Sequence, residues 1–223
     1  MEQSEEEVAK KFGIDIEALK REQLKLAKEL KLKDSLKLSE ITKIGAIASF
    51  IVKNRIISTV IVCDKNSEIL EQQYFVDKLN FPYIYGFRAY RELNSMIEAI
   101  NKLNERPDII LVSGHGITHP RLGLASHLSL AVNLPTIGVS NSLFEGNKVS
   151  ENGEDILLNN KKVGKVLQSK EKSNPLYISP GNRISIESAY EFIKSLVRPP
   201  HKMPEPLHLS HKYAKEVQEE INV

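Results

Sequence analysis

Asp108-Ile-Ile-Leu-Val112 is a short, continuously apolar run, and Ser113-Gly-His-Gly-Ile-Thr-His-Pro-Arg-Leu-Gly123 follows it directly. Such a run is typical of a strand that is buried on both faces of a sheet. The Gly-rich continuation is typical of a turn that leads into a helix, expected near 121–132. In open α/β sheets, ligands bind at the carboxyl ends of such strands. The stretch therefore predicts an α/β sheet with a functional site at the end of this strand.

The flanking segments extend the same sheet. Three apolar, β-branched runs come first, and the polar breaks between them are short enough for antiparallel hairpins. Apolar residues at helical spacing predict the first helices. The expected strands are 44–51, 55–63, 68–76, 108–112, 135–139, 162–169 and 175–179; the expected helices are 16–33, 91–104, 121–132, 185–197 and 206–221; residues 145–161 are expected to form an exposed loop or hairpin. The order βββαβαβ predicts a mixed sheet with helices on both faces, compatible with a ribonuclease-H-like fold.

Length and composition narrow the class of protein. The chain has 223 residues, of which 41% are hydrophobic and 27% charged, as in an ordinary globular protein. We expect a single domain, 1–223, in which residues 1–40 form a helical lead-in. The net charge of +2 argues against a polybasic coat or an acidic tail, although residues 161–223 carry 11 basic and 7 acidic side chains, a mild bias that suits phosphate.

One cysteine, Cys63, excludes an intramolecular disulfide and a cysteine-ligated zinc site. The start of the sequence lacks the apolar segment of a signal peptide, and no stretch approaches the ~18 consecutive apolar residues of a membrane span. We therefore expect a cytoplasmic protein without a membrane partner.

The turn that follows Val112 has two interpretations. Gly114 and Gly116 let a ligand approach the backbone closely, and His115 and His119 can donate to phosphate or act as acid or base. Alternatively, the glycines serve only the geometry of a tight turn and the histidines cap it. Residue chemistry alone weighs these two interpretations about evenly.

A second candidate is Phe81-Pro-Tyr-Ile-Tyr-Gly-Phe-Arg-Ala-Tyr-Arg-Glu92, which places five aromatic side chains and two arginines within twelve residues. Aromatic rings interleaved with arginine suit stacking on bases while phosphates are held. Tyr83 and Tyr85 flank a turn and favour this function. For Phe81 and Phe87, a loop packed under the sheet is the better interpretation, with Arg91 and Glu92 capping a helix.

A third candidate is Ser179-Pro-Gly-Asn-Arg183. Its Pro-Gly-Asn is interpreted as a turn that opens a helix, and the N-terminus of that helix can hold an anion. The Pro-rich segment 199–206 is predicted to be an extended strap between the last two helices.

These segments, in this order, resemble the endonuclease V family. The resemblance covers roughly 16–217 and includes Phe81-Pro-Tyr-Ile-Tyr-Gly86, Arg91-Glu92, Pro107-Asp-Ile-Ile-Leu-Val112, Gly114-His-Gly116, Gly123-Leu-Ala-Ser-His-Leu128, Leu134-Pro-Thr-Ile-Gly-Val139 and Ile178-Ser-Pro-Gly181. It implies a ribonuclease-H-like fold and Mg²⁺-dependent cleavage of DNA or RNA near deaminated bases, chiefly inosine. It also implies a loop that acts as a wedge beside the lesion and a pocket for the extruded base.

The resemblance gives roles to individual residues. Tyr83 matches the wedge tyrosine, Glu92 the helix carboxylate of the metal site, and His211 the late histidine. On the same basis, the expected base pocket and nucleic-acid surface comprise Tyr83, Ile84, Tyr85, Gly86, Gly114, His115, Gly116, His119, Arg121 and Gly123.

Other functional positions depart from the family pattern. Ala48 and Ser113 stand at the positions of aspartates, Asn141 at that of a lysine and Asn182 at that of a histidine. Mg²⁺ needs oxygen ligands, usually one or two carboxylates besides phosphate, so Glu92 alone should hold it weakly or not at all. We therefore expect a nucleic-acid-binding family member in which Glu92 and His211 are catalytic remnants and cleavage is weak or lost.

Two alternatives remain open. The protein is an active nuclease if other acids replace the missing ligands, and Asp64, Asp77 and Asp108 are the acids nearby in sequence. It is a protein-interaction module if the fold has abandoned nucleic acid, in which case Tyr83 should be buried.

Overall fold

The three β-branched runs form one side of a sheet. In the computed structural model, which describes residues 5–221, they are β1 (Ile44–Val52), β2 (Arg55–Cys63) and β3 (Ile69–Lys78), joined as antiparallel neighbours. The predicted hairpins are confirmed. The expected domain, 1–223, and lead-in, 1–40, include residues 1–4 and 222–223, which lie outside the described part of the chain.

The centre of the sheet is parallel. The apolar run after Pro107 forms β4 (Ile109–Ser113), which lies between β1 and β5 (Thr136–Ser140) and runs parallel to both. Because the three strands point the same way, their carboxyl ends meet at one edge, which we call the strand edge. It is the part of the sheet at which the sequence predicts the site.

The sheet continues beyond β5 with antiparallel strands. These are β9 (Leu176–Asn182), β8 (Lys161–Leu167), β7 (Asp155–Leu158) and β6 (Asn147–Val149). Within the described residues the order is β3-β2-β1-β4-β5-β9-β8-β7-β6. Of the two structures expected for residues 145–161, a loop or a hairpin, the hairpin is observed, and its strands β6 and β7 lie at the far end of the sheet.

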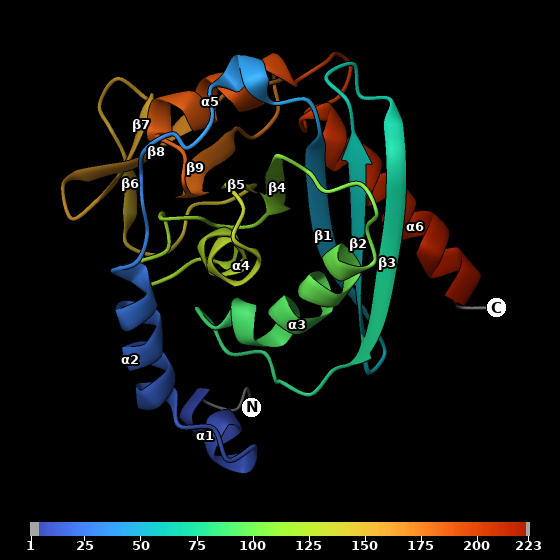
Figure 1. Ribbon diagram of the computed structural model, residues 1–223. Coiled ribbons are helices and arrows are strands. Elements are labelled where there is room, and N and C mark those ends of the chain that lie inside the picture. Colours follow the sequence, from blue (N-terminus) through green and yellow to red (C-terminus); the bar gives the residue numbers. More distant parts are fainter. Residues whose placement is uncertain (1–4, 222–223) are drawn as a thin grey trace.

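Helices cover both faces, as the sequence predicts (Figure 1). α3 (Arg88–Asn101) and α4 (Leu124–Val132) bury one apolar core with Ile47 and Val112. α5 (Ile186–Ser195) and α6 (Glu205–Ile221) bury the other, with Ala46 and Leu111. Neighbouring residues of one strand thus enter opposite cores, which is why the central strands are apolar throughout.

The lead-in packs on the aromatic segment. α1 (Glu5–Lys11), α2 (Ile16–Ala27) and the short helix η1 (Leu38–Glu40) precede the sheet. Side chains of α1 and α2 form a small third core with Ile84 and Phe87. The prediction of a helix over 16–33 is too long: Lys31 accepts a backbone hydrogen bond from Arg183 and its N–H donates to Asn182, which draws the chain out of the helix.

Two further predictions are corrected. Pro180-Gly-Asn182 does not open a helix but completes β9, opposite an irregularity of β5 at Thr136/Ile137 that accommodates the proline. The helix after it begins only at Ile186, with Ser185 as its N-cap. The aromatic segment passes into α3 at Arg88, so Arg91 and Glu92 lie inside that helix and do not cap it.

Among residues 5–221, no helix is both long and apolar enough to cross a membrane.

Candidate nucleic-acid site at the strand edge

Ala48 and Ser113, which stand where the resemblance implies aspartates, are neighbours in the sheet. Ile47 and Val112 are register partners on β1 and β4, and both enter the core under α3 and α4. Ala48 and Ser113 each follow by one residue, so they lie side by side at the strand edge and face α6, the helix that carries His211. Thr59, the partner of Ala48 on β2, lies 3.5 Å from the carbonyl oxygen of Ser210.

Arg88 joins Glu92 to this edge. Its Nε donates to Glu92 Oε1 at 2.5 Å, one helical turn away, and its Nη1 donates to the carbonyl oxygen of Ser113 at 2.9 Å. Glu92 is only 6% exposed, and its second oxygen, Oε2, is buried without a hydrogen-bond partner. The one carboxylate that the family pattern keeps is therefore already in an ion pair with a guanidinium.

A magnesium ion does not fit this set of ligands. Ala48 has no donor atom, Ser113 has a neutral hydroxyl, and one oxygen of Glu92 is used by Arg88. Within residues 5–221, no group of three or more His, Cys, Asp or Glu side chains is placed to hold a metal ion. Mg²⁺ requires near-octahedral oxygen ligation that this edge does not offer.

The other acids in the neighbourhood are used elsewhere. Asp108 accepts from the backbone N–H groups of Thr42 and Lys43 at the start of β4, and Asp64 closes the turn after β2. Both lie at the end of the sheet opposite the strand edge, because Ile44 pairs with Ile109 and with Cys63. Asp77 accepts from Asn94 on α3.

A lysine reaches the strand edge from the strap. Lys202 Nζ donates to Asn141 Oδ1 at 2.8 Å, just past the end of β5. Asn141 stands where the resemblance implies a lysine, so a cation is present at this position although it comes from a different part of the chain.

The aromatic loop, residues 81–87, presents its two tyrosines differently. Tyr83 is 67% exposed, and the Arg91 guanidinium lies 5.7 Å from its ring centroid. Tyr85 is 38% exposed, stacks on Phe144 at 4.8 Å, and its hydroxyl accepts from the N–H of Glu145. Only Tyr83 is therefore free to enter a nucleic-acid stack, while Tyr85 is part of a wall.

His119 fixes this loop in place. Its Nδ1 accepts from the N–H groups of Arg121 and Leu122, both at 3.1 Å, so that nitrogen carries no proton and Nε2–H donates to the Gly86 carbonyl oxygen at 3.0 Å. Burial, helped by the Arg121 charge, lowers the pKa of His119 to about 3. The histidine is neutral at physiological pH and acts as a positioning residue.

Gln23 ties the lead-in to the same carbonyl. It is almost completely buried, donates to Gly86 O at 3.0 Å and accepts from Arg121 Nε at 2.7 Å. Arg121 also lies over the Phe87 ring at 5.0 Å. Arg121, expected at the nucleic-acid surface, thus organises the back of the aromatic loop.

His115 lies across the turn from His119. Its Nδ1 is 3.1 Å from Thr118 Oγ1 and its Nε2 is 3.4 Å from Ser140 Oγ. Burial, and secondarily the positive charge of Arg88, lowers the pKa of His115 to about 4. It can exchange hydrogen bonds with a ligand but does not supply a positive charge.

A cavity of about 250 Å³ opens between these groups. It is smaller than the roughly 300–1,000 Å³ of drug-sized ligand sites, which suits a single base. Six of the ten expected residues line it, together with Arg88, Ser140 and Phe144; the six are Tyr83, Ile84, Tyr85, Gly86, His115 and His119.

Four of the expected residues do not line this small cavity. Gly116 and Gly123 pack on backbone, since a Cβ would lie 2.2 Å from Pro180 O at Gly116 and 2.2 Å from Gly116 O at Gly123. For these two glycines the close backbone contacts favour the turn-geometry interpretation. Gly114 lies beside Arg88, and Arg121 borders a different cavity.

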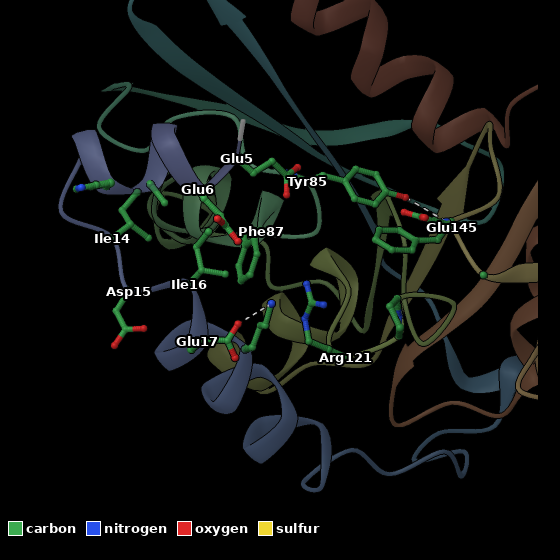
Figure 2. A pocket seen from close by; sticks show the side chains of 16 residues that line it. Glu5, Glu6, Ile14, Asp15, Ile16, Glu17, Tyr85, Phe87, Arg121 and Glu145 are labelled. Carbon is green, nitrogen blue, oxygen red and sulfur yellow. Dashed lines mark hydrogen bonds and ion pairs between the residues drawn. The ribbon is translucent and has the colours of Figure 1, made fainter. Parts of the chain in front are cut away.

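That second, larger cavity measures about 620 Å³ and shares Tyr85 and Phe144 with the first. Figure 2 shows the side chains that line it. It lies against α1 and α2, and Glu5 accepts from the N–H of Tyr85. Five carboxylates line it against three cations, so it does not suit phosphate; the carboxylates are Glu5, Glu6, Asp15, Glu17 and Glu145.

Sequence reasoning missed Arg88, Gln23, Lys202 and Phe144. Arg88 was detectable in principle, because Arg and Glu four residues apart pair on a helix, but the helix was expected to begin at 91. Gln23 lies at helical spacing between Leu19 and Leu26 in the sequence, and a polar residue on such an apolar face signals a buried hydrogen-bond partner. Lys202 and Phe144 meet their partners only through the tertiary fold.

The sequence model of the endonuclease V family matches residues 24–212. Endonuclease V of Thermosipho melanesiensis is 36% identical over 177 residues, which cover 77% of this chain and 78% of that protein. Endonuclease V of Dictyoglomus thermophilum is 32% identical over 180 residues, with the same coverage.

Solved structures agree. The catalytic domain of human endonuclease V superposes with a TM-score of 0.84 at 25% identity and covers 93% of this chain and 99% of that one. Ciona intestinalis endonuclease V, solved with a 24mer DNA containing an inosine followed by a ribo-adenosine, gives 0.84 at 24% identity and covers 92% and 98%. The predicted ribonuclease-H-like fold is thereby confirmed. Because the family model matches residues 24–212, which are most of this chain, the chain belongs to the endonuclease V family.

Proposed function

We propose that this protein binds nucleic acid that contains a deaminated base, chiefly inosine, and cleaves it weakly or not at all. Membership of the family and the inosine-containing DNA bound by the Ciona relative support the ligand. Whether the strand is DNA or RNA is an outcome of the binding experiment described below.

One observation carries the proposal: a base-sized cavity stands next to a strand edge at which the carboxylate of Glu92 is engaged by an arginine. The cavity, of about 250 Å³, keeps aromatic walls and the exposed Tyr83 at its mouth. The family is metal-dependent in general, yet Ala48 and Ser113 supply no charged ligand here. Metal-assisted hydrolysis needs an ion to position water and stabilise the developing charge.

The two alternatives have less support. For an active nuclease with substituted ligands, Asp64 and Asp108 lie at the wrong end of the sheet and Asp77 is bound to Asn94. For a protein-interaction module, Tyr83 should be buried, and it is 67% exposed.

The experiment pairs a binding and a cleavage assay. Fluorescently labelled single strands of DNA and RNA, each with one inosine, are compared with matched strands that carry adenine instead. We expect tighter binding to the inosine strands, weakening as salt rises because phosphate contacts contribute, and no cleavage with Mg²⁺ or Mn²⁺ above a Glu92→Ala control. Equal binding to all strands, or rapid cleavage that Glu92→Ala abolishes, contradicts the proposal.

A further inference from the structure

We propose that the Arg88 guanidinium is the fixed cation of the strand edge: it occupies the place of a divalent ion beside Glu92 and receives a backbone phosphate. The phosphate part rests on the proposed function. That Arg88 takes the place of an ion beside Glu92 does not depend on the proposed function.

The contacts of Arg88 are those of a bridging ion. It spans Glu92 Oε1 on α3 and the Ser113 carbonyl oxygen at the end of β4, at 2.5 and 2.9 Å. The guanidinium neutralises Glu92 and links α3 to the end of β4, and this is the positive charge that a metal ion would supply if one were bound beside Glu92. Unlike a bound ion, the guanidinium is covalently attached and stays charged at every physiological pH.

Space for this side chain is built into the turn. A Cβ at Gly114 would approach Arg88 Nη1 to 3.2 Å and Leu124 Cδ2 to 3.3 Å, so a larger residue there would crowd the guanidinium. Glycine at 114 therefore leaves room for Arg88.

Arg88 has donors left for a ligand. Two of its five N–H groups serve Glu92 and Ser113, and its side chain is 43% exposed. It lines the small cavity with Tyr83 and His115, so a strand whose base entered that cavity would bring phosphate close to the remaining N–H groups. Guanidinium and phosphate form strong, geometrically matched hydrogen bonds.

The neighbouring charges support this role. His115 is neutral, so Arg88 is the charged group lining this cavity among the described residues. At the end of the adjacent strand β5, Lys202 donates to Asn141. The strand edge thus holds two side-chain cations over neighbouring strands against the negative charge of Glu92, and this excess of positive charge attracts a polyanion without a metal.

Arg88 should also oppose metal binding. A divalent ion at Glu92 would have to displace the guanidinium or bear its repulsion at short range. Adding Ala48→Asp and Ser113→Asp would provide two more carboxylates at the ends of the same strands, but Arg88 would still hold a positive charge beside any ion that they shared with Glu92.

The first experiment is a calorimetric titration with Mn²⁺, without nucleic acid. It compares wild type, Ala48→Asp/Ser113→Asp, and the same double variant with Arg88→Met. We expect no measurable binding by wild type and at least about tenfold tighter binding by the triple than by the double variant, the scale of one charge-assisted contact. If the double and triple variants are folded by circular dichroism and bind Mn²⁺ with equal affinity, the proposal that Arg88 holds the place of a divalent ion is wrong.

The second experiment measures binding of the labelled inosine strand with EDTA or with Mg²⁺. Wild type should bind equally in both, and Arg88→Met should lose about tenfold in affinity. Arg106→Met, which removes an equal charge from a residue hydrogen-bonded to Val132, is the matched control and should lose much less.

The outcomes separate the two proposals. If wild type binds the inosine strand selectively but Arg88→Met behaves like Arg106→Met, or binding requires Mg²⁺, the phosphate role of Arg88 is wrong and the proposed function stands. If wild type shows no selective binding, the proposed function is wrong, the phosphate role falls with it, and the Mn²⁺ titration still decides whether Arg88 holds the ion's place.

Discussion

The chemistry of individual side chains at this site departs from what their types suggest. His115 and His119 look like acid–base groups or phosphate donors in the sequence. In the fold, two backbone N–H groups donate hydrogen bonds to His119 Nδ1. A protonated imidazole cannot accept these bonds, because both of its ring nitrogens carry a proton. The charge at the site comes instead from Arg88, whose partner Glu92 looked like a metal ligand.

Tyr83 is the residue whose removal should affect binding and little else. It is 67% exposed, so Tyr83→Ala should leave the free energy of unfolding nearly unchanged. If its ring stacks on a base, binding of the inosine strand should weaken by about 1–3 kcal/mol. Fluorescence anisotropy measures the affinity. Tyr85→Phe, which removes only the hydroxyl that accepts from Glu145, is the control; if both variants bind like wild type, the wedge role is wrong.

At the scale of elements, the sequence predicts what depends on local pattern. The apolar runs give the central strands, since residues that enter cores on both faces leave no polar alternation. Pro180-Gly181 was wrongly predicted to form a turn, because such pairs usually end strands. The irregularity of β5 that accommodates the pair has no signal in the sequence. The cavity's far wall at Phe144 and the Lys202–Asn141 pair depend on contacts across 59 and 61 residues, which no local pattern encodes.

The aromatic loop depends on Gly86. This residue has φ +78°, and a Cβ would lie 2.6 Å from Arg121 Nη2. Gly153, in the β6–β7 turn, has φ +77°, and a Cβ there would have no atom within 4 Å. A substitution at Gly153 therefore measures the cost of the backbone conformation alone, without steric crowding. Gly153→Ala should lower the free energy of unfolding by about 1 kcal/mol, and Gly86→Ala by more.

Urea unfolding measures both glycine variants, and strand binding separates them further. Only Gly86→Ala should weaken binding of the inosine strand, because the aromatic loop supplies Tyr83 and three other residues that line the small cavity. Equal destabilisation together with unchanged binding would mean that the loop tolerates a side chain at 86 and that Arg121 simply moves aside.

Contacts between the lead-in and the loop should be as important as those within the loop. Gln23→Met keeps the side-chain length but removes the donor to Gly86 O and the acceptor for Arg121 Nε. The Arg121 guanidinium is half-buried, so leaving its Nε–H without a partner should cost about 1 kcal/mol, the lower end of the penalty for a buried group. Urea unfolding should show this loss, whereas Gln73→Met on β3, whose amide donates only to Glu71, should cost less.

For the whole molecule, the fold is that of the family, and our proposal assigns its difference from the family to the charges at one edge. The sheet order and the parallel registers place Ala48, Ser113 and Asn141 together regardless of their side chains. The buried histidines add a global consequence, because they link the folded state to pH. In the unfolded chain they bind protons near pH 6.5, whereas the folded protein holds the pKa of His115 at about 4 and that of His119 at about 3.

Folding stability should therefore fall as the solution becomes acidic. Their contribution is fully present above pH 6.5 and is lost as the pH falls toward 4, because only the unfolded chain takes up the protons. Between pH 7.5 and 5.0 each histidine should cost about 2 kcal/mol of unfolding free energy. Carboxylates with lowered pKa, such as Asp108, add their own loss only at lower pH. Urea unfolding at the two pH values of wild type and His119→Asn measures the effect.

His119→Asn should be less stable than wild type at pH 7.5 but lose about 2 kcal/mol less on acidification, since the proton that His119 takes up on unfolding is gone. If His119→Asn does not fold, the imidazole resonances of wild type give the same answer: the His119 ring should remain neutral down to about pH 4, as a group pinned by two N–H donors on Nδ1 must. Titration of that ring near its ordinary pKa would show that the network around Gly86 O opens in solution and that His119 does not hold the aromatic loop.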